Sequence, residues 1–173
     1  MYASHGHDVL YDEVMKAMKW EISILKRVRQ HPHIVQILGA DDDAGVVIME
    51  KGETDLKNFL QSNEVFSLDI CRLWMSHMLL AVDFMHSIGI VHQDMKTANI
   101  LLFTHSPNQD LTKWSAKVCD FGLSRLHAPD MTTDREMITL WYRPPELLMG
   151  CFFYTEKVYM FPKLFCSQSL PPE

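Results

Sequence analysis

The chain has 173 residues, of which 47% are hydrophobic and 22% are charged, and its formal net charge is −6 at pH 7. This size and composition suffice for one globular domain with its own core. The mildly acidic charge gives no reason to expect a nucleic-acid or membrane partner, and no apolar run reaches membrane-spanning length. No CxxC spacing occurs among the cysteines, which predicts reduced thiols in a cytoplasmic or nuclear protein.

The first predicted element is a helix from about residue 8 to residue 30, in which apolar residues recur every three or four positions. These residues are Val14, Met18, Ile22, Leu25 and Val28. Pro32 ends the helix because its ring forbids continuation, so His31 and His33 are predicted to lie in a turn. A metal site at these two histidines is the less favoured alternative.

Two short strands follow, at residues 35–40 and 45–50, and three aspartates join them. The pattern predicts a hairpin with a solvated acidic tip at Asp41, Asp42 and Asp43. The aspartates could bind Ca²⁺, but no EF-hand spacing follows, so a charged turn is favoured.

The clearest helix spans Ser67 to Ser87, with Ser67 as its predicted N-cap and Gly89 as its C-terminal stop. Apolar residues surround most of this helix, which predicts that it is buried at the centre of the fold. The chain then enters the segment VHQDMKTANILL, Val91 to Leu102, whose polar residues are the best candidates for chemistry.

Asp94, Lys96 and Asn99 lie within six residues, on a loop that enters an apolar strand, so they can face one site. Phosphoryl transfer needs a carboxylate to orient the attacking hydroxyl, a cation beside the phosphate and hard oxygen ligands for Mg²⁺. Asp94 suits the first role and Lys96 the second. Asn99 suits the third together with Asp120, which lies in the nearby segment KVCDFGLS. The two segments predict phosphoryl transfer from a nucleotide triphosphate.

Three motifs resemble those of eukaryotic protein kinases and follow the order of that family. HQDMKTAN resembles the catalytic loop H-R-D-L-K-x-x-N, CDFG the metal-binding D-F-G motif, and TLWYRPPELLMG the A-P-E segment. The last has the form found in cyclin-dependent and mitogen-activated kinases, the CMGC group, and Lys96 is the choice of Ser/Thr kinases. One such motif could arise by chance in ordinary polar loops, but three in order favour the family.

The resemblance implies ATP as co-substrate, Mg²⁺ as cofactor and a catalytic set of four residues: Asp94, Lys96, Glu21 and Thr139. Glu21 would lie on the helix that carries the family's conserved glutamate and would pair with the family's phosphate-holding lysine. This chain is expected to lack that lysine, because Lys16 and Lys19 belong to the helix pattern. A solvated helix charge is the alternative for Glu21. Thr139 would hydrogen-bond Asp94 or Lys96.

The resemblance also implies a nucleotide-binding set, which consists of Glu50, Gly52, Asp55, Lys96, Asn99 and Asp120. Asn99 and Asp120 would hold the metal. Glu50 and Gly52 fall in the hinge whose backbone groups hold adenine, and Asp55 would reach the ribose or cap the next helix.

His92 could act as a general base, but its family position packs against the phenylalanine of D-F-G. The resemblance therefore predicts that this histidine belongs to a stack that ties two parts of the fold together. The stack would consist of His92, Phe121, Leu25 and Ile37.

Gln93 stands where the family usually has an arginine that binds a phosphorylated activation loop through charge-assisted bonds. Glutamine supplies no such charge. We therefore expect that activity does not depend in the ordinary way on phosphorylation of this loop, which carries Thr132 and Thr133.

The chain departs from the family at both ends, because no G-x-G-x-x-G occurs and the family pattern stops at Val158. The expected fold class is α+β, a partial bilobal kinase fold that lacks the first strands and the last helices. Residues 1–158 would form the partial domain, with 8–52 as a remnant of the N-terminal lobe and 53–158 as part of the C-terminal lobe. Residues 159–173 would form a divergent tail.

Two functions compete on these grounds. The favoured one is a protein Ser/Thr kinase that moves the γ-phosphoryl of ATP to a protein hydroxyl, impaired in this chain by the missing parts. The other is an inactive, truncated pseudokinase or scaffold that acts by protein binding. Trp141, Tyr142 and Arg143 suggest a proline-directed substrate by analogy. A cyclin partner has weak support, because MKAMKWE, Met15 to Glu21, keeps only the glutamate of the PSTAIRE segment.

Overall fold

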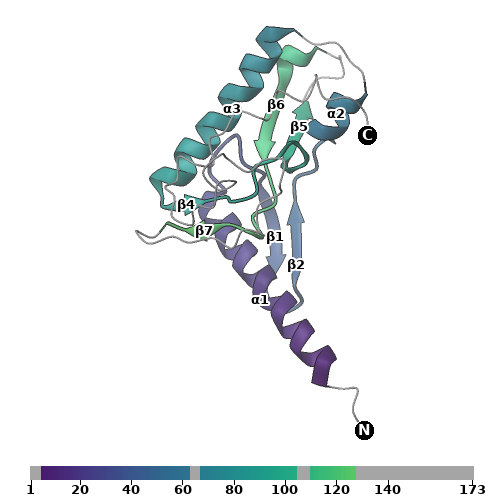
Figure 1. The fold of residues 1–173 in the computed structure, drawn as a ribbon, viewed down its shortest axis with the longest axis vertical. Coiled ribbons are helices and arrows are strands. Elements are labelled where there is room, and N and C mark those ends of the chain that lie inside the picture. Colours follow the sequence, from purple (N-terminus) through teal and green to yellow (C-terminus); the bar gives the residue numbers. More distant parts are fainter. Residues whose placement is uncertain (1–4, 63–66, 105–109, 128–173) are drawn as a thin grey trace, which may run out of the picture.

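The computed structural model describes residues 5–62, 67–104 and 110–127, and the fold is drawn in Figure 1. The predictions for Thr132, Thr133, Thr139 and the tail after Val158 lie outside these residues. Among the helices of the described ranges, none is both long and apolar enough to span a bilayer.

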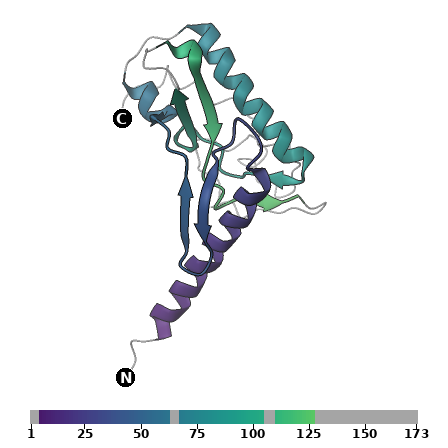
Figure 2. The ribbon, with the colours of Figure 1, turned by 180° about the vertical axis from the view of Figure 1, so that it is seen from behind.

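The first part of the fold is a long helix with a hairpin beside it (Figures 1 and 2). Helix α1 spans His5–Val28, and the antiparallel hairpin consists of strands β1 (Ile37–Asp41) and β2 (Val46–Met49). The turn between the strands is closed by Asp41, whose Oδ1 accepts the backbone N–H groups of Asp43 and Ala44 at 3.0 and 2.9 Å. The predicted acidic hairpin tip is therefore confirmed.

The second part combines two small sheets with helices. Strands β3 (Thr54–Asp55), β5 (Ile100–Thr104) and β6 (Trp114–Val118) form an antiparallel sheet in the order β3-β5-β6, and β4 (Ile90–Val91) pairs with β7 (Arg125–Leu126). The α-helices are α2 (Leu56–Gln61) and α3 (Leu68–Ser87). Two short 3₁₀ helices complete the order, η1 (Thr97–Asn99) and η2 (Leu111–Lys113).

One hydrophobic core joins the two parts. Leu25 and Val28 from the last turns of α1, Trp74 from α3 and Phe121 are all buried in it. The backbone adds a direct link, since Val35 N–H donates to the Val118 carbonyl and Val118 N–H donates to the His33 carbonyl, each at 2.9 Å. The end of β6 is thus fixed to the segment that follows α1.

Helix α3 begins and ends where its sequence signals predict. The Ser67 hydroxyl accepts the Ile70 N–H, and Gly89 adopts a left-handed φ of +72° just beyond the helix. The prediction of burial on all sides was wrong, because Leu79 and Leu80 are 43% and 53% exposed. Strands β5 and β6 lie along one side of the helix (Figure 1), and the apolar pattern alone does not say which side faces them.

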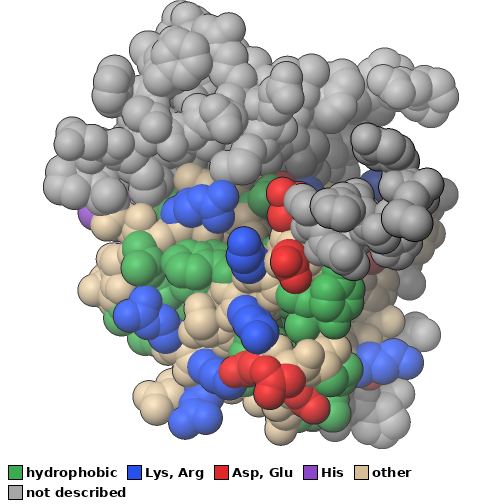
Figure 3. Space-filling view, turned by 90° about the horizontal axis from the view of Figure 1, so that it is seen from below, with side chains coloured by type: hydrophobic (Ala, Val, Ile, Leu, Met, Phe, Trp, Pro, Cys, Tyr) green, Lys and Arg blue, Asp and Glu red, His purple; other side chains and the backbone are tan. Residues whose placement is uncertain are grey.

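Helix α1 also buries only part of its predicted stripe. Ile22, Leu25 and Val28 are buried, whereas Val14 is 51% exposed. The N-terminal half of α1 extends away from the rest of the fold (Figure 1), so periodicity continues there without a core to pack against. On the lower face, charged side chains of both signs alternate with apolar ones (Figure 3).

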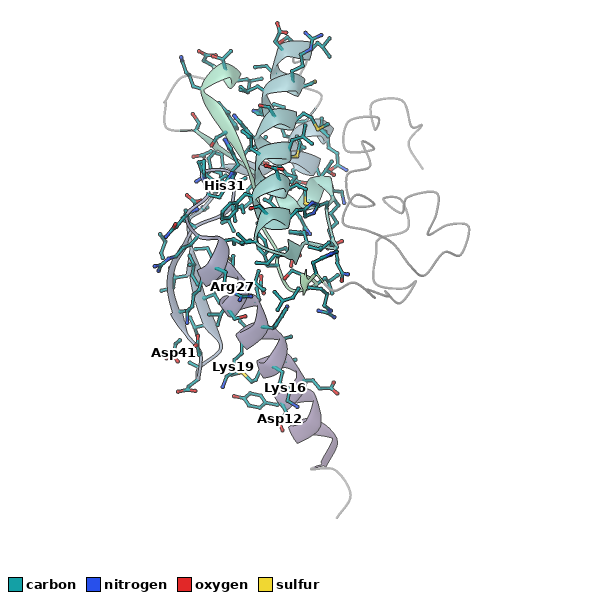
Figure 4. All side chains as sticks on the ribbon, turned by 90° about the vertical axis from the view of Figure 1, so that its left-hand side faces the viewer. Asp12, Lys16, Lys19, Arg27, His31 and Asp41 are labelled. Carbon is teal, nitrogen blue, oxygen red and sulfur yellow. The ribbon has the colours of Figure 1, made fainter. Side chains whose placement is uncertain are left out.

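Two weak ion pairs connect α1 with the hairpin tip. Lys26 Nζ lies 3.2 Å from Asp42 Oδ1, and Lys19 Nζ lies 3.7 Å from Asp43 Oδ1. All four side chains are at least half exposed, so each pair contributes little to stability. Figure 4 shows Lys16 and Lys19 below Arg27, on the part of α1 that leads away from α3.

Candidate functional site

The loop between β4 and β5 holds Asp94, Lys96 and Asn99 in mutual contact. Asp94 Oδ2 accepts hydrogen bonds from Lys96 Nζ at 2.5 Å and from Asn99 Nδ2 at 2.9 Å. Asn99 Nδ2 also donates to the Asp94 backbone carbonyl at 3.0 Å. Asp94 and Asn99 are 6% and 5% exposed. The carboxylate is therefore held in one orientation by charge-assisted bonds that are only weakly screened by solvent.

Strand pairing brings Asp120 to this loop. Ile100, at the start of β5, is paired with Val118, at the end of β6, so the residues just outside these two positions are neighbours. Cys119 N–H donates to the Asn99 carbonyl at 3.0 Å. Asp120 then takes a left-handed φ of +64°, a conformation that costs energy for most residues and that Asp tolerates better than others.

The donor set fits Mg²⁺. The bonds of Asn99 to Asp94 use its Nδ2 and leave Oδ1, and in the described ranges the Asp120 carboxylate forms no hydrogen bond or ion pair. Both are hard oxygen ligands of the kind that Mg²⁺ prefers. No cluster of three or more His, Cys, Asp or Glu side chains forms a metal site among the described residues. Two side chains completed by phosphate oxygens and water are the usual arrangement for Mg²⁺.

The charges around Cys119 show that the site is electrostatically negative. Burial, together with the charges of Asp120, Asp55 and Glu21 and against the charge of Lys96, raises the pKa of the Cys119 thiol to about 12. The three carboxylates among these causes attract a cation. The charge of these residues therefore favours a cation at the oxygens of Asn99 and Asp120.

His92 is a packing residue, as predicted. Its ring is buried and meets the Phe121 ring edge-on, with the centroids 4.9 Å apart. Nδ1 accepts the Asp94 N–H at 3.2 Å, so the proton is assigned to Nε2, which donates to the Cys119 carbonyl at 3.0 Å. Burial lowers the pKa of His92, which keeps the ring neutral. Leu25 is buried in the same core, and Ile37 packs against its edge.

Glu21 lies beside the turn that begins at Phe121. Its Oε1 accepts the Phe121 N–H at 3.3 Å. Burial raises the pKa of this half-buried carboxyl, the Phe121 bond lowers it, and the charge of Asp120 raises it. Within the described residues no Lys, Arg or His lies within ion-pair distance of Glu21. The solvated-charge alternative for Glu21 is wrong, because its half-buried carboxylate contacts the Phe121 N–H.

The Glu50 side chain is committed to the fold. Lys117 Nζ lies 2.7 and 2.8 Å from its two carboxylate oxygens, and Lys117 also lies over the Phe103 ring, 4.7 Å from the centroid. Glu50 N–H donates to the Gln36 carbonyl at 3.0 Å. Because the side chain and the N–H of Glu50 are both engaged, its backbone carbonyl is the group left to bind adenine.

Gly52 and Asp55 follow Glu50 and lie against β5. A Cβ at Gly52 would lie 3.1 Å from Leu101 Cβ and 3.2 Å from the Leu102 carbonyl oxygen, so a larger residue would fit only if β5 shifted slightly. Asp55 caps α2, because its Oδ1 accepts the Asn58 N–H at 2.8 Å. Capping, the simpler of its two predicted roles, is confirmed.

Sequence reasoning missed two contacts near the site. One is the Lys117–Glu50 ion pair. The presence of Lys117 in the mainly apolar strand β6 could have indicated that it has an acidic partner. The other is Trp20, whose Nε1–H donates to the Ser124 carbonyl at 2.9 Å. Nothing in the local sequence points to that contact, since the two residues are 104 positions apart.

Comparisons with known proteins agree with the motifs. A family model described as "Protein kinase domain" matches residues 6–162. The chain is 32% identical over 163 residues to a probable cell division protein kinase of Encephalitozoon cuniculi, covering 92% of this chain and 46% of that protein.

Two further relatives are similar. The chain is 36% identical to a probable cyclin-dependent kinase 10 of Dictyostelium discoideum, over 80% of this chain and 37% of that protein. It is 34% identical to cyclin-dependent kinase 11.1 of Caenorhabditis elegans, over 81% of this chain and 20% of that protein. The chain thus spans less than half the length of each of these relatives.

Proposed function

Because the chain belongs to the protein kinase family, and to its cyclin-dependent-kinase-like part, we propose that it supplies the catalytic and metal-binding loops of an ATP-dependent protein Ser/Thr kinase. The partial bilobal fold agrees with this family. The observation that carries the proposal is the contact between Asp94, Lys96 and Asn99, with Asp120 placed beside them by strand pairing.

In the proposed reaction the oxygen of a substrate hydroxyl forms a bond to the γ-phosphorus while the bond from that phosphorus to the ADP oxygen breaks. Asp94 orients the hydroxyl and accepts its proton, and Lys96, held against Asp94, stabilises charge on the transferred group. Asn99 Oδ1 and the Asp120 carboxylate would hold Mg²⁺, which when bound neutralises phosphate charge.

The proposal is tested by phosphate transfer from ATP labelled at the γ-phosphate to protein substrates. Asp94→Asn removes the acceptor for the hydroxyl proton, so transfer is expected to fall by about 100-fold or more. Asp83→Asn is the matched control, because it makes the same chemical change on the exposed face of α3. Equal transfer by the wild-type and Asp94→Asn proteins would rule the proposed role out.

A second candidate, a non-catalytic protein that binds partners, is favoured by Glu21. Its carboxylate contacts a backbone N–H instead of a cation within the described residues. This candidate predicts that no labelled phosphate moves to any substrate, whether or not Mg²⁺·ADP binds. Transfer that requires Asp94 would exclude it.

Independence from activation-loop phosphorylation is a further part of the proposal. Gln93 is buried and neutral, with a left-handed φ of +66°, and offers no positive charge to a phosphate. Turnover before and after phosphatase treatment is expected to differ by less than about twofold, against the large changes that loop phosphorylation produces where an Arg reads it. A large drop on dephosphorylation would contradict this expectation.

The substrate and partner classes are proposed from the family alone. A proline-directed substrate predicts faster phosphorylation of a Ser-Pro peptide than of the matching Ser-Ala peptide. A cyclin partner has weak support, and location in the cytoplasm or nucleus stays a prediction.

A further inference from the structure

Two adjacent residues of α1 contact the two ends of one tight turn. Glu21 Oε1 accepts the N–H of Phe121, and Trp20 Nε1–H donates to the carbonyl of Ser124. Between these points the turn closes on itself, because the Ser124 N–H and hydroxyl both donate to the Phe121 carbonyl, at 3.0 and 2.6 Å. Phe121 and Ser124 are fully buried. Helix α1 therefore contacts a compact turn at both of the turn's ends, Phe121 and Ser124.

The two contacts differ in charge. The Glu21 and Asp120 carboxylates both lie close to Gly122, since a Cβ there would lie 3.9 Å from Glu21 Oε2 and 3.6 Å from Asp120 Oδ1. Like charges repel, so this side of the helix tends to move away from the turn. The Trp20 indole is neutral, and its bond to a backbone carbonyl opposes that movement without adding charge.

We propose that Trp20 is a positioning residue, whose indole N–H holds the turn after Asp120 against α1 and so fixes where the Asp120 carboxylate points. This inference rests on the proposed function, because Asp120 is the metal ligand of that proposal. The role belongs to the hydrogen bond and not to the bulk of the ring.

Trp114 offers a matched control for the loss of an indole N–H. Its Nε1 is buried and has no hydrogen-bond partner among the residues that the structure describes, so Trp114→Phe removes the same group without breaking a bond there. Trp20→Phe keeps most of the ring volume and breaks the bond to Ser124. A difference between the two variants therefore reports the hydrogen bond.

The deciding measurement is amide hydrogen exchange in the full chain, compared between peptides that cover residues 119–126 and peptides that cover α3. Loss of one hydrogen bond is expected to speed exchange in residues 119–126 by about fivefold to tenfold in Trp20→Phe. Exchange in α3 is expected to be unchanged, and Trp114→Phe is expected to leave residues 119–126 unchanged. If Trp20→Phe exchanges like wild type at the turn, or faster everywhere including α3, the inference is overturned.

A second readout connects the turn to the metal. Trp20→Phe is expected to weaken ADP binding in the presence of Mg²⁺ by about fivefold and to leave ADP binding without metal unchanged. A purely structural role would weaken both equally, which would overturn the inference. If the wild-type chain binds no Mg²⁺·ADP, the proposed function fails, and the exchange comparison still decides the role of Trp20 in holding the turn.

Discussion

A single ion pair between Glu50 and Lys117 joins the end of the hairpin to β6. The Lys117 and Glu50 side chains are 11% and 21% exposed, and two of their atoms approach to 2.7 Å. Removing one member of this pair is expected to lower the unfolding free energy, because the remaining charge would stay partly desolvated without a partner.

The pair can be tested by a double-mutant cycle with Lys117→Met and Glu50→Gln. Each single variant is expected to lose about 2 kcal/mol of unfolding free energy, less than the ~3–5 kcal/mol of a fully buried pair, because Glu50 keeps some solvent contact. The double variant is expected to lose about 1 kcal/mol less than the sum of the two. Urea denaturation measures all four proteins, and strictly additive losses would show that the two side chains do not interact.

Sequence distance explains which site residues could be predicted. Asp94, Lys96 and Asn99 lie on one loop, so their spacing alone implied that they meet. The partners of Lys117 and Trp20 are 67 and 104 positions away, and no local pattern encodes such contacts. Asp120 was predictable only through its motif, because strand pairing is what brings it to Asn99.

Among the elements, α3 separates what a local pattern encodes from what it does not. Ser67 and Gly89 marked its ends correctly, because capping depends on the residues within one turn of the helix. Its exposed leucines were not predicted, because burial depends on which neighbours the rest of the chain supplies. The same reason separates the buried C-terminal half of α1 from its exposed N-terminal half.

The glycine that ends α3 gives the prediction at this scale. Gly89 has a φ of +72°, and a Cβ there would meet nothing within 4 Å. Gly89→Ala is therefore expected to cost about 1 kcal/mol of stability through backbone strain alone.

Gly39 is the matched position for this substitution, because its backbone is not left-handed and a Cβ would sit 3.7 Å from Ile48 in ordinary contact. Gly39→Ala is expected to change the unfolding free energy by less than about 0.5 kcal/mol. Thermal unfolding of both variants makes the comparison. An equal loss at the two positions would show that left-handed strain is not the cause.

At the scale of the whole molecule, three histidines lie where the segment after α1 meets α3. The rings of His33 and His77 stack with centroids 3.9 Å apart, and His31 stacks on Phe84 at 5.0 Å. Burial and the charge of His33 lower the pKa of His77 to about 4, and burial also lowers the pKa of His31 and of His33. The predicted turn is confirmed, because the Ile34 N–H donates to the His31 carbonyl at 3.2 Å.

These lowered pKa values predict that acid weakens the fold. An unfolded histidine binds a proton below about pH 6.5, whereas the folded His77 resists protonation until about pH 4, so stability falls as the pH falls between these values. The raised pKa of Glu21 acts in the opposite sense, because protonating that carboxyl favours the folded state.

The pH dependence is tested by melting temperatures between pH 7 and pH 4.5. His77→Asn keeps an acceptor for the Ala116 N–H, which donates to His77 Nδ1 at 3.2 Å, but it removes the titrating ring. The decline in melting temperature on acidification is expected to be shallower in this variant than in wild type. Parallel curves would exclude His77 as a source of the acid sensitivity.

Helix α1, the β1–β2 hairpin and helix α3 were predictable, because each carries its own periodicity or end signals, whereas the α+β class came from the family resemblance. The way the two parts join was not, because it depends on backbone bonds between distant segments, such as Val35 to Val118. Family resemblance supplied what physical pattern reading alone could not, namely which distant polar residues share a site.

The two hydrogen bonds of His92 have a mechanical consequence. One rigid ring connects the peptide at Asp94 to the peptide at Cys119, and its two nitrogens fix the spacing between these segments. The ring thus holds the end of β6 at a fixed spacing from the loop that carries Asp94. Asp120, one residue beyond Cys119, is therefore anchored on its N-terminal side.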